Sequence, residues 1–192
     1  MSQPINQFVD PIKLLRPESE LERSLLQTPE FQEGLFWGEP RFGHPEGKVV
    51  FHIEEILGNI DRLTRRFPHF REKLRLIAFV HDTFKFCEDK SRPRDWSRHH
   101  GILGRHFFEN FYQEHDVLET IELHDEAFYC WRIFAQQQMH VEGLQSLDRL
   151  FRRVEPFLQL YYLFFWCDTC TGDKNPTPLR WFEKMVTGIE IV

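Results

Sequence analysis

The sequence predicts an all-α fold, built as a single-domain helical bundle. Apolar residues recur at spacings of three and four residues along most of the chain, which is the period of an amphipathic helix. No stretch alternates apolar and polar residues in the manner of a half-buried strand. The 192 residues, of which 41% are hydrophobic and 20 are Phe, suit one domain around one sizeable core.

Seven helices are predicted, and Pro or Gly residues mark several of the breaks between them. The expected helices cover residues 18–29, 46–66, 70–86, 99–114, 116–134, 144–168 and 178–187. Residues 1–17 are expected to be a loosely structured lead-in, and EDKSRPRDWSR at 88–98 a polar loop. The run TGDKNPTP at 171–178 is expected to form the turn before the last helix. The helical domain is therefore expected to span residues 18–192.

Most of these helices are predicted from an apolar stripe. The stripes are Val49, Ile53, Ile56, Ile60 and Leu63 in the second helix; Leu74, Ile77 and Ala78 in the third; Leu103, Phe107 and Phe111 in the fourth; Val117, Ile121, Phe128 and Trp131 in the fifth; and Leu150, Val154, Phe157, Tyr161 and Phe164 in the sixth. The same helical spacing places His52, His81 with Asp82, His100, His124 and Asp168 on or beside these stripes. Five helices therefore direct a histidine or an aspartate toward the core.

These inward-facing polar residues have two interpretations. A single histidine on an apolar face is usually a hydrogen-bonded core residue, and an aspartate at a helix end is usually a cap or is solvated. The same coincidence in five helices is much less probable, and a shared cation would offset the desolvation of Asp82 and Asp168. Imidazole and carboxylate together suit borderline divalent ions such as Zn, Mn, Fe, Co or Ni. The sequence therefore favours a metal site.

The order of four motifs resembles a known family. HPEGKVVFH (44–52), FVHDTFK (79–85), HHGILGRHF (99–107) and ELHDEAF (122–128) occur in the order seen in the HD domain of bacterial CCA-adding tRNA nucleotidyltransferases. The resemblance is to the HD superfamily of metal-dependent phosphohydrolases, and it covers residues 44–172. It implies a helical bundle of the HD-domain type. The nucleotidyltransferase half has no counterpart in this chain, so the resemblance does not imply tRNA end repair.

The resemblance implies roles for particular residues. His52, His81, Asp82 and Asp168 match the ligands of the principal metal, and Lys85 matches the lysine that often follows the His-Asp pair. His100 and His124 match the further histidines of members that hold a second metal or more phosphate ligands. Two positions depart from the family pattern: Phe84 replaces a glycine, and Asp125 replaces a second histidine. Because of Asp125, one ion with phosphate-contacting histidines is favoured over two ions.

The implied reaction is hydrolysis of a small phosphorylated substrate, in particular a nucleotide. A divalent ion (Mn, Fe, Co, Ni, Zn or Mg) would activate a water, Asp82 would orient that water or accept its proton, and Lys85 would neutralise charge on the phosphate. Arg98 and Arg105 are expected to form a phosphate-binding rim, although a solvated face is the alternative. His44 and Glu46 are expected to support the ligand shell.

Other functions remain open at this point. A module that senses a nucleotide without hydrolysing it is the alternative to an enzyme, and retention of Lys85 with the four principal ligands favours the enzyme. A purely structural helical protein would not explain polar residues on five core stripes. The oligomeric state is left open.

Composition limits the partners. The net charge of −6 gives no general electrostatic footprint for nucleic acid, which is therefore not an expected partner. The N-terminus lacks the features of a secretory signal, and no apolar run is long enough to span a membrane, so no membrane partner is expected. The four Cys residues lack the spacing of a disulfide framework. We expect a soluble, cytoplasmic protein with free thiols.

Overall fold

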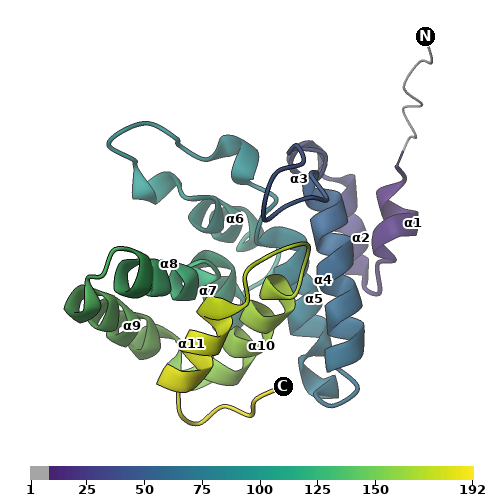
Figure 1. Ribbon diagram of the computed structural model, residues 1–192. Helices are drawn as coiled ribbons and strands as arrows, with labels where there is room; N and C mark the ends of the chain where they lie inside the picture. Colours follow the sequence, from purple (N-terminus) through teal and green to yellow (C-terminus); the bar gives the residue numbers. More distant parts are fainter. Residues whose placement is uncertain (1–8) are drawn as a thin grey trace.

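The computed structural model describes residues 9–192 and confirms the all-α prediction (Figure 1). Within this range all regular structure is helical, apart from an isolated bridge between Arg41 and His44. The α-helices are α1 (Pro11–Leu15), α2 (Glu20–Gln27), α3 (Pro29–Leu35), α4 (Val49–Leu63), α5 (Arg71–Val80), α6 (His100–Phe108), α7 (His115–Leu123), α8 (Glu126–Trp131), α9 (His140–Val154), α10 (Leu158–Thr169) and α11 (Thr177–Met185). Among the described residues, no helix is both long and apolar enough to cross a membrane.

The core lies around α5, which packs against α4, α7 and α10. Every residue of α5 from Leu74 to Val80 is buried, including the charged Arg75. Arg75 can be buried because its Nε donates to Glu22 Oε1 of α2 at 2.8 Å. In Figure 1, α1 to α3 cover α4 on one side, while α8, α9 and α11 lie on the other side with α10. The ends of α5, α7 and α10 therefore meet inside the molecule.

Two predicted helices are each two helices in the structure, and one helix was not predicted. The helix predicted at 18–29 corresponds to α2, whereas α3 lies in a part of the chain where no helix was predicted and begins at Pro29. Residues 116–134 divide at His124 and Asp125 into α7 and α8. Residues 144–168 divide at Glu155–Phe157, a 3₁₀ turn that contains Pro156, into α9 and α10. The breaks change the direction of the chain, which a continuous apolar stripe does not reveal.

Other boundaries also differ from prediction. The helix predicted at 99–114 ends as an α-helix at Phe108. The predicted helix at 70–86 ends as an α-helix at Val80, so His81 and Asp82 follow its last turn and Lys85 begins a 3₁₀ turn (Lys85–Cys87). The predicted lead-in contains α1, because Asp10 accepts hydrogen bonds from the backbone of Ile12 and Lys13 and Pro11 occupies the first turn. Residues 1–8 of that lead-in lie outside the described residues.

Candidate metal centre

The four residues that match the principal metal ligands lie together. His52 comes from α4, His81 and Asp82 follow α5, and Asp168 lies near the end of α10. His52 Nε2 lies 2.9 Å from Asp168 Oδ1 and 3.6 Å from Asp82 Oδ2. His81 Nε2 lies 3.5 Å from Asp82 Oδ2 and 3.9 Å from Asp168 Oδ1. Two imidazole nitrogens and two carboxylate oxygens therefore surround one point.

A second group of donors surrounds the other oxygen of Asp82. Asp82 Oδ1 lies 3.3 Å from His100 Nε2, at the start of α6, and 3.4 Å from His124 Nε2, at the end of α7. Asp125 Oδ2 lies 3.5 Å from His100 Nε2 and 3.8 Å from His124 Nε2. Asp82 thus faces a different pair of histidines with each of its oxygens.

All four inward-facing histidines are oriented in the same way. Each has Nδ1 next to an acceptor and Nε2 toward the centre: His52 Nδ1 lies 3.2 Å from Glu46 Oε1, His81 Nδ1 2.9 Å from Ala78 O, His100 Nδ1 3.1 Å from Glu88 Oε1, and His124 Nδ1 2.8 Å from Ile121 O. In His81, His100 and His124 a proton on Nδ1 leaves the Nε2 lone pair free for a metal, and metal-binding histidines in proteins have outer partners of this kind. In His52 the Nδ1 atom makes no hydrogen bond to the described residues, and Nε2 hydrogen-bonds to Asp168 Oδ1 at 2.9 Å, a contact that a metal ion would replace. The arrangement fits ligation better than it fits core histidines with unrelated partners.

His99 is oriented in the opposite way. Its Nδ1 accepts a hydrogen bond from the backbone N–H of Gly101 at 3.2 Å, so the ring proton of the neutral form lies on Nε2. Nε2 lies 3.5 Å from Asp125 Oδ2 and 3.2 Å from the Tyr129 hydroxyl. With its proton on Nε2, His99 therefore faces Asp125 as a hydrogen-bond donor.

The contact between His100 and His124 needs a cation. Their Nε2 atoms lie 3.1 Å apart, and both rings donate from Nδ1, so one Nε2 must carry an extra proton or both must bind a shared positive charge. Burial disfavours a charge on His124, but the carboxylates of Asp125 and Asp82 outweigh it and raise its pKa to about 9. Without a metal, a proton on His124 supplies that charge.

The remaining groups are in the charge states that ligands need. Burial lowers the pKa of His81 to about 3, so its imidazole is neutral. Burial opposes ionisation of Asp82, but the charge of Lys85 and hydrogen bonds with His100 and His124 keep its pKa well below the usual range. Asp168 behaves similarly, because the charge of Lys174 and a hydrogen bond from His52 outweigh burial and lower its pKa. The neutral imidazole of His81 therefore faces the ionised carboxylates of Asp82 and Asp168.

Two buried polar atoms without hydrogen-bond partners bear on whether a metal ion fits the site. His81 Nε2 and Asp82 Oδ1 have no hydrogen-bond partner among the described residues. A buried polar atom without a partner is destabilising by about 1–3 kcal/mol, and a metal ion would satisfy both atoms. Two sets, one of His52, His81 and Asp168 and one of Asp82, His100 and His124, each have donor atoms within 4.8 Å of one another. These buried clusters could hold metal ions.

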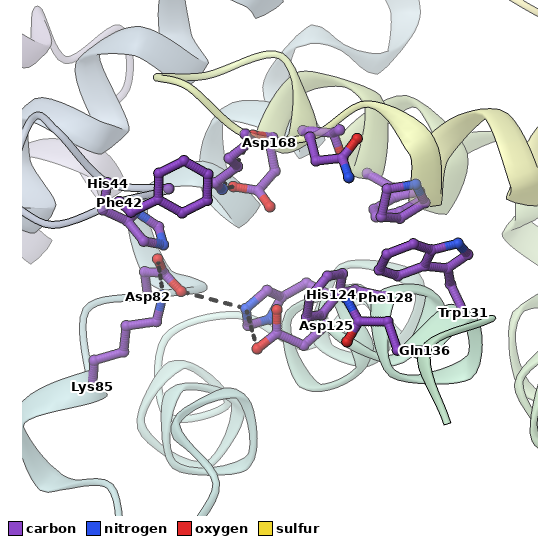
Figure 2. A pocket seen from close by; sticks show the side chains of 16 residues that line it. Phe42, His44, Asp82, Lys85, His124, Asp125, Phe128, Trp131, Gln136 and Asp168 are labelled. Atoms are coloured by element: carbon purple, nitrogen blue, oxygen red, sulfur yellow. Dashed lines mark hydrogen bonds and ion pairs between the residues drawn. The ribbon is translucent and has the colours of Figure 1, made fainter. Parts of the chain in front are cut away.

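A cavity of about 380 Å³ opens beside these ligands. Its lining includes Asp82, Lys85, His124, Asp125 and Asp168 (Figure 2). Lys85 Nζ donates to Asp82 Oδ2 at 2.5 Å. A small molecule in the cavity would therefore touch the candidate ligands and an ammonium group at once.

Several residues of the site were not identified from the sequence. Lys174 lines the cavity, and its Nζ donates to Asp168 Oδ1 at 2.7 Å. Glu88 accepts from His100 and pairs with Arg94. Two weak indications of these residues are present in the sequence. Lys174 follows Asp168 by six residues, and Glu88 begins the loop before His100.

The structure places Arg105 away from the cavity that lies beside the candidate ligands. Its guanidinium pairs with Glu119 and Glu122 of α7, and Arg153 of α9 joins the same network. Arg105 therefore connects helices and does not line the cavity. Arg98 is exposed and also lies outside the cavity lining. Lys85 and Lys174 occupy the place that the two arginines were expected to take.

In comparisons with known proteins, no family model, curated protein or solved structure matches the chain. The resemblance to the HD superfamily therefore rests on the four motifs alone and stays a prediction.

Proposed function

We propose that this protein is a metal-dependent phosphohydrolase that hydrolyses a small phosphoester. The observation that carries the proposal is the common orientation of His52, His81, His100 and His124, whose Nε2 atoms converge on Asp82 beside a cavity. Lys85 and Lys174 line the cavity, and the positive charge of their ammonium groups would attract a phosphate. Imidazole, carboxylate and lysine around one cavity are the groups that phosphoester hydrolysis requires.

We further propose two ions, although the sequence favoured one. Asp82 Oδ2 faces His52 and His81, while Oδ1 faces His100 and His124, so the carboxylate would bridge two positions. Asp125 would supply the second position with a carboxylate where the family has a histidine. Mn, Fe, Co, Ni or Zn suit this donor set better than Mg, because four of the donors are imidazoles.

The chain's own residues would then have separate roles in the hydrolysis. A bound divalent ion supplies a polarised phosphoryl oxygen and a coordinated water of lowered pKa. Asp82, with each oxygen facing one proposed ion position, would orient that water, whose proton would leave to solvent. Lys85 and Lys174, each already beside a carboxylate, would donate hydrogen bonds to the phosphate oxygens as charge increases on them.

The test is a screen of phosphomonoesters and phosphodiesters with each of Mg, Mn, Fe, Co, Ni and Zn, combined with metal analysis. We expect activity with at least one ion and about two ions per chain. Asp82→Asn should lose both ions and lower kcat by at least about 100-fold. Mutation of a residue that only supports a metal ligand typically costs about 10–100-fold, and loss of a ligand should cost at least as much. Asp148→Asn, on the exposed face of α9, is the matched control and should change neither.

Two results would contradict the proposal. Full activity of Asp82→Asn would show that the chemistry lies elsewhere. Bound ions and tight nucleotide binding without turnover of any ester would instead support the sensing module that the sequence left as the alternative.

A further inference from the structure

The break between α7 and α8 lies between two pockets. His124 and Asp125 line the cavity of the candidate metal centre, whereas their neighbours Leu123 and Glu126 line a second pocket of about 390 Å³. Residues of α6 and α9 complete this second pocket, and α8 packs against α9 (Figure 1). Apart from His99, none of the side chains that line it has a role at the candidate metal centre.

Part of the second pocket is aliphatic. Ile102 of α6, Leu123 and Leu150 of α9 line it, and the two leucines are buried. Trp96 also lines the pocket and is 55% exposed. The volume lies near the small end of ligand pockets, which span about 300–1,000 Å³. A ligand of this pocket is therefore small and carries an apolar group.

Two charged side chains of the second pocket are already paired. Glu122 Oε1 lies 2.7 Å from Arg153 Nη2, and Glu122 Oε2 lies 2.6 Å from Arg105 Nη1. These ion pairs join α6, α7 and α9, so they stabilise the packing of the helices and leave neither Glu122 nor Arg153 available as the main partner of a ligand.

Glu126 and Arg149 of the same pocket are not paired with each other or with another charged group of residues 9–192. The half-buried Glu126 side chain forms no hydrogen bond there, and the contact of Arg149 is a hydrogen bond from its Nη2 to Ser146 Oγ at 2.7 Å. Both charges act on one buried thiol: burial raises the pKa of Cys130, the charge of Glu126 raises it further, and that of Arg149 lowers it. The pocket therefore presents one carboxylate and one guanidinium to a ligand.

We infer that the second pocket binds a free α-amino acid with an aliphatic side chain. The ammonium group of the ligand donates to the Glu126 carboxylate, and its carboxylate accepts hydrogen bonds from the Arg149 guanidinium. The aliphatic side chain packs against Ile102, Leu123 and Leu150. A zwitterion provides a partner for both unpaired charges at once, which a simple amine or a simple carboxylic acid does not.

The position of the pocket links the ligand to the candidate metal centre. His99 lines the pocket, and its Nε2 lies 3.5 Å from Asp125 Oδ2. A ligand that joins Glu126 of α8 to Arg149 of α9 restrains the break that places His124 and Asp125. The amino acid and the ion beside His124 therefore favour the binding of each other, and thermodynamic linkage makes the effect reciprocal. This link rests on the proposed second ion, whereas the amino-acid site does not.

Isothermal titration of chelator-treated protein with L-leucine, L-isoleucine and L-valine tests the site without any use of turnover. We expect saturable binding of at least one of them. The two analogues that lack one charged group, which for leucine are 4-methylpentanoate and 3-methylbutylamine, should each bind at least about tenfold more weakly. Each analogue loses one charge-assisted set of hydrogen bonds.

Two variants assign the charged groups. Glu126→Gln should weaken the amino acid at least about tenfold without weakening the analogue that lacks the ammonium group. Arg149→Gln should weaken the amino acid to the same degree without weakening the analogue that lacks the carboxylate. Arg152→Gln, at an exposed arginine of α9 outside the pocket, is the matched control and should change no affinity.

Titration with Mn²⁺, with and without the saturating amino acid, tests the link to the metal centre. The amino acid should lower the dissociation constant of one Mn²⁺ step at least about fivefold, and Glu126→Gln should lose this effect. No binding of any of the three amino acids, or equal binding of the amino acid and both analogues, would overturn the site. Amino-acid binding that leaves every Mn²⁺ step unchanged would overturn the link. Amino-acid binding without any Mn²⁺ binding would contradict the proposed metal centre and leave the amino-acid site supported.

Discussion

Glu46 and Glu88 hold two of the candidate ligands in place. Glu46 Oε1 lies 3.2 Å from His52 Nδ1, and Glu88 Oε1 lies 3.1 Å from His100 Nδ1, whereas backbone carbonyls occupy the same position for His81 and His124. A carboxylate at Nδ1 fixes the tautomer and increases the basicity of Nε2. Each glutamate therefore supports one of the two proposed ions.

We expect Glu46→Gln and Glu88→Gln to weaken different ions. Glu46→Gln should lower the affinity of the ion held by His52, and Glu88→Gln that of the ion held by His100, by about 10–100-fold each. Isothermal titration with Mn²⁺ or Zn²⁺ should show one weakened step of two in each variant. Glu142→Gln, in the exposed first turn of α9, is the control. Loss of the same step in both variants would contradict the assignment.

Periodicity found the ligands that lie on helices and missed the residues that support them. His52 and Asp168 could be predicted because helical spacing places them beside apolar residues that must be buried. Glu88 and Lys174 lie in loops, where no repeat relates position in the chain to direction in space. Their contacts depend on the path of each loop over the core, which the sequence pattern does not encode.

Helix ends bring the candidate ligands together. His81 and Asp82 follow the last residue of α5, and His124 and Asp125 lie between α7 and α8. A continuous helix through these positions, as the sequence predicted, would carry the next side chains away from the centre. Because both helices end there, the chain turns and Asp82 and Asp125 face the same two histidines.

The close contact between α6 and α7 depends on Gly101. A Cβ at this position would lie 2.6 Å from Glu122 O and 3.0 Å from Ile121 O, both backbone atoms. Gly101→Ala should therefore push α6 away from α7, lower the free energy of unfolding by about 1–3 kcal/mol, and weaken the ion between His100 and His124. Urea unfolding and metal titration would measure both effects.

Gly58→Ala in α4 provides the matched control. Apart from its chain neighbours and the helix's own backbone, nothing among the described residues lies within 4 Å of a Cβ at Gly58, so alanine should stabilise this helix by about 0.5–1 kcal/mol. Equal effects of Gly58→Ala and Gly101→Ala would show that helix propensity, and not the contact between α6 and α7, decides the result.

The buried face of α6 differs in part from the predicted stripe. His100 is buried as predicted, Leu103 and Phe107 are half-buried, and Phe111 is 43% exposed because it lies beyond the end of the helix at Phe108. Gly101, Gly104 and Phe108 also pack inward. Close approach of two helices is most favourable where side chains are smallest, and hydrophobicity does not measure this property. For α4, where large apolar residues form the contact, the predicted stripe is fully buried.

The whole molecule concentrates ionised groups around one centre, so its stability should depend on pH. Burial opposes ionisation of Glu46 and Glu88, but hydrogen bonds from their histidines outweigh it and lower both pKa values to about 2 from 4.5. Their contribution is complete above about pH 4.5 and is lost as the pH falls toward 2. His124, with its pKa raised to about 9 from 6.5, contributes below about pH 6.5 and loses its contribution as the pH rises to 9.

We therefore expect the metal-free protein to be most stable between about pH 4.5 and 6.5. Thermal unfolding in a chelator, at intervals from pH 3 to pH 9.5, should give a Tm that falls on both sides of this range. His124→Gln should remove the decrease on the alkaline side and keep the decrease on the acid side. A Tm that is constant from pH 6.5 to 9.5 in the wild-type protein would contradict the assigned charge of His124.

Metal ions should join elements that are far apart in the chain. The proposed ligands come from α4, α6, α10 and the residues after α5 and α7, so a bound ion connects most of the core and binds only the folded state. At 100 times the dissociation constant such an ion adds about 2.7 kcal/mol to the free energy of unfolding. For a chain of 192 residues this corresponds to a rise in Tm of roughly 5–10 °C.

Addition of Mn²⁺, Fe²⁺, Co²⁺, Ni²⁺ or Zn²⁺ to chelator-treated protein should produce this rise in the wild type and in Asp148→Asn. The same ions should produce little or no rise in Asp82→Asn, because the bridging carboxylate is gone. If none of these ions changes the Tm of the wild type, the convergence of the four Nε2 atoms on Asp82 does not constitute a metal centre.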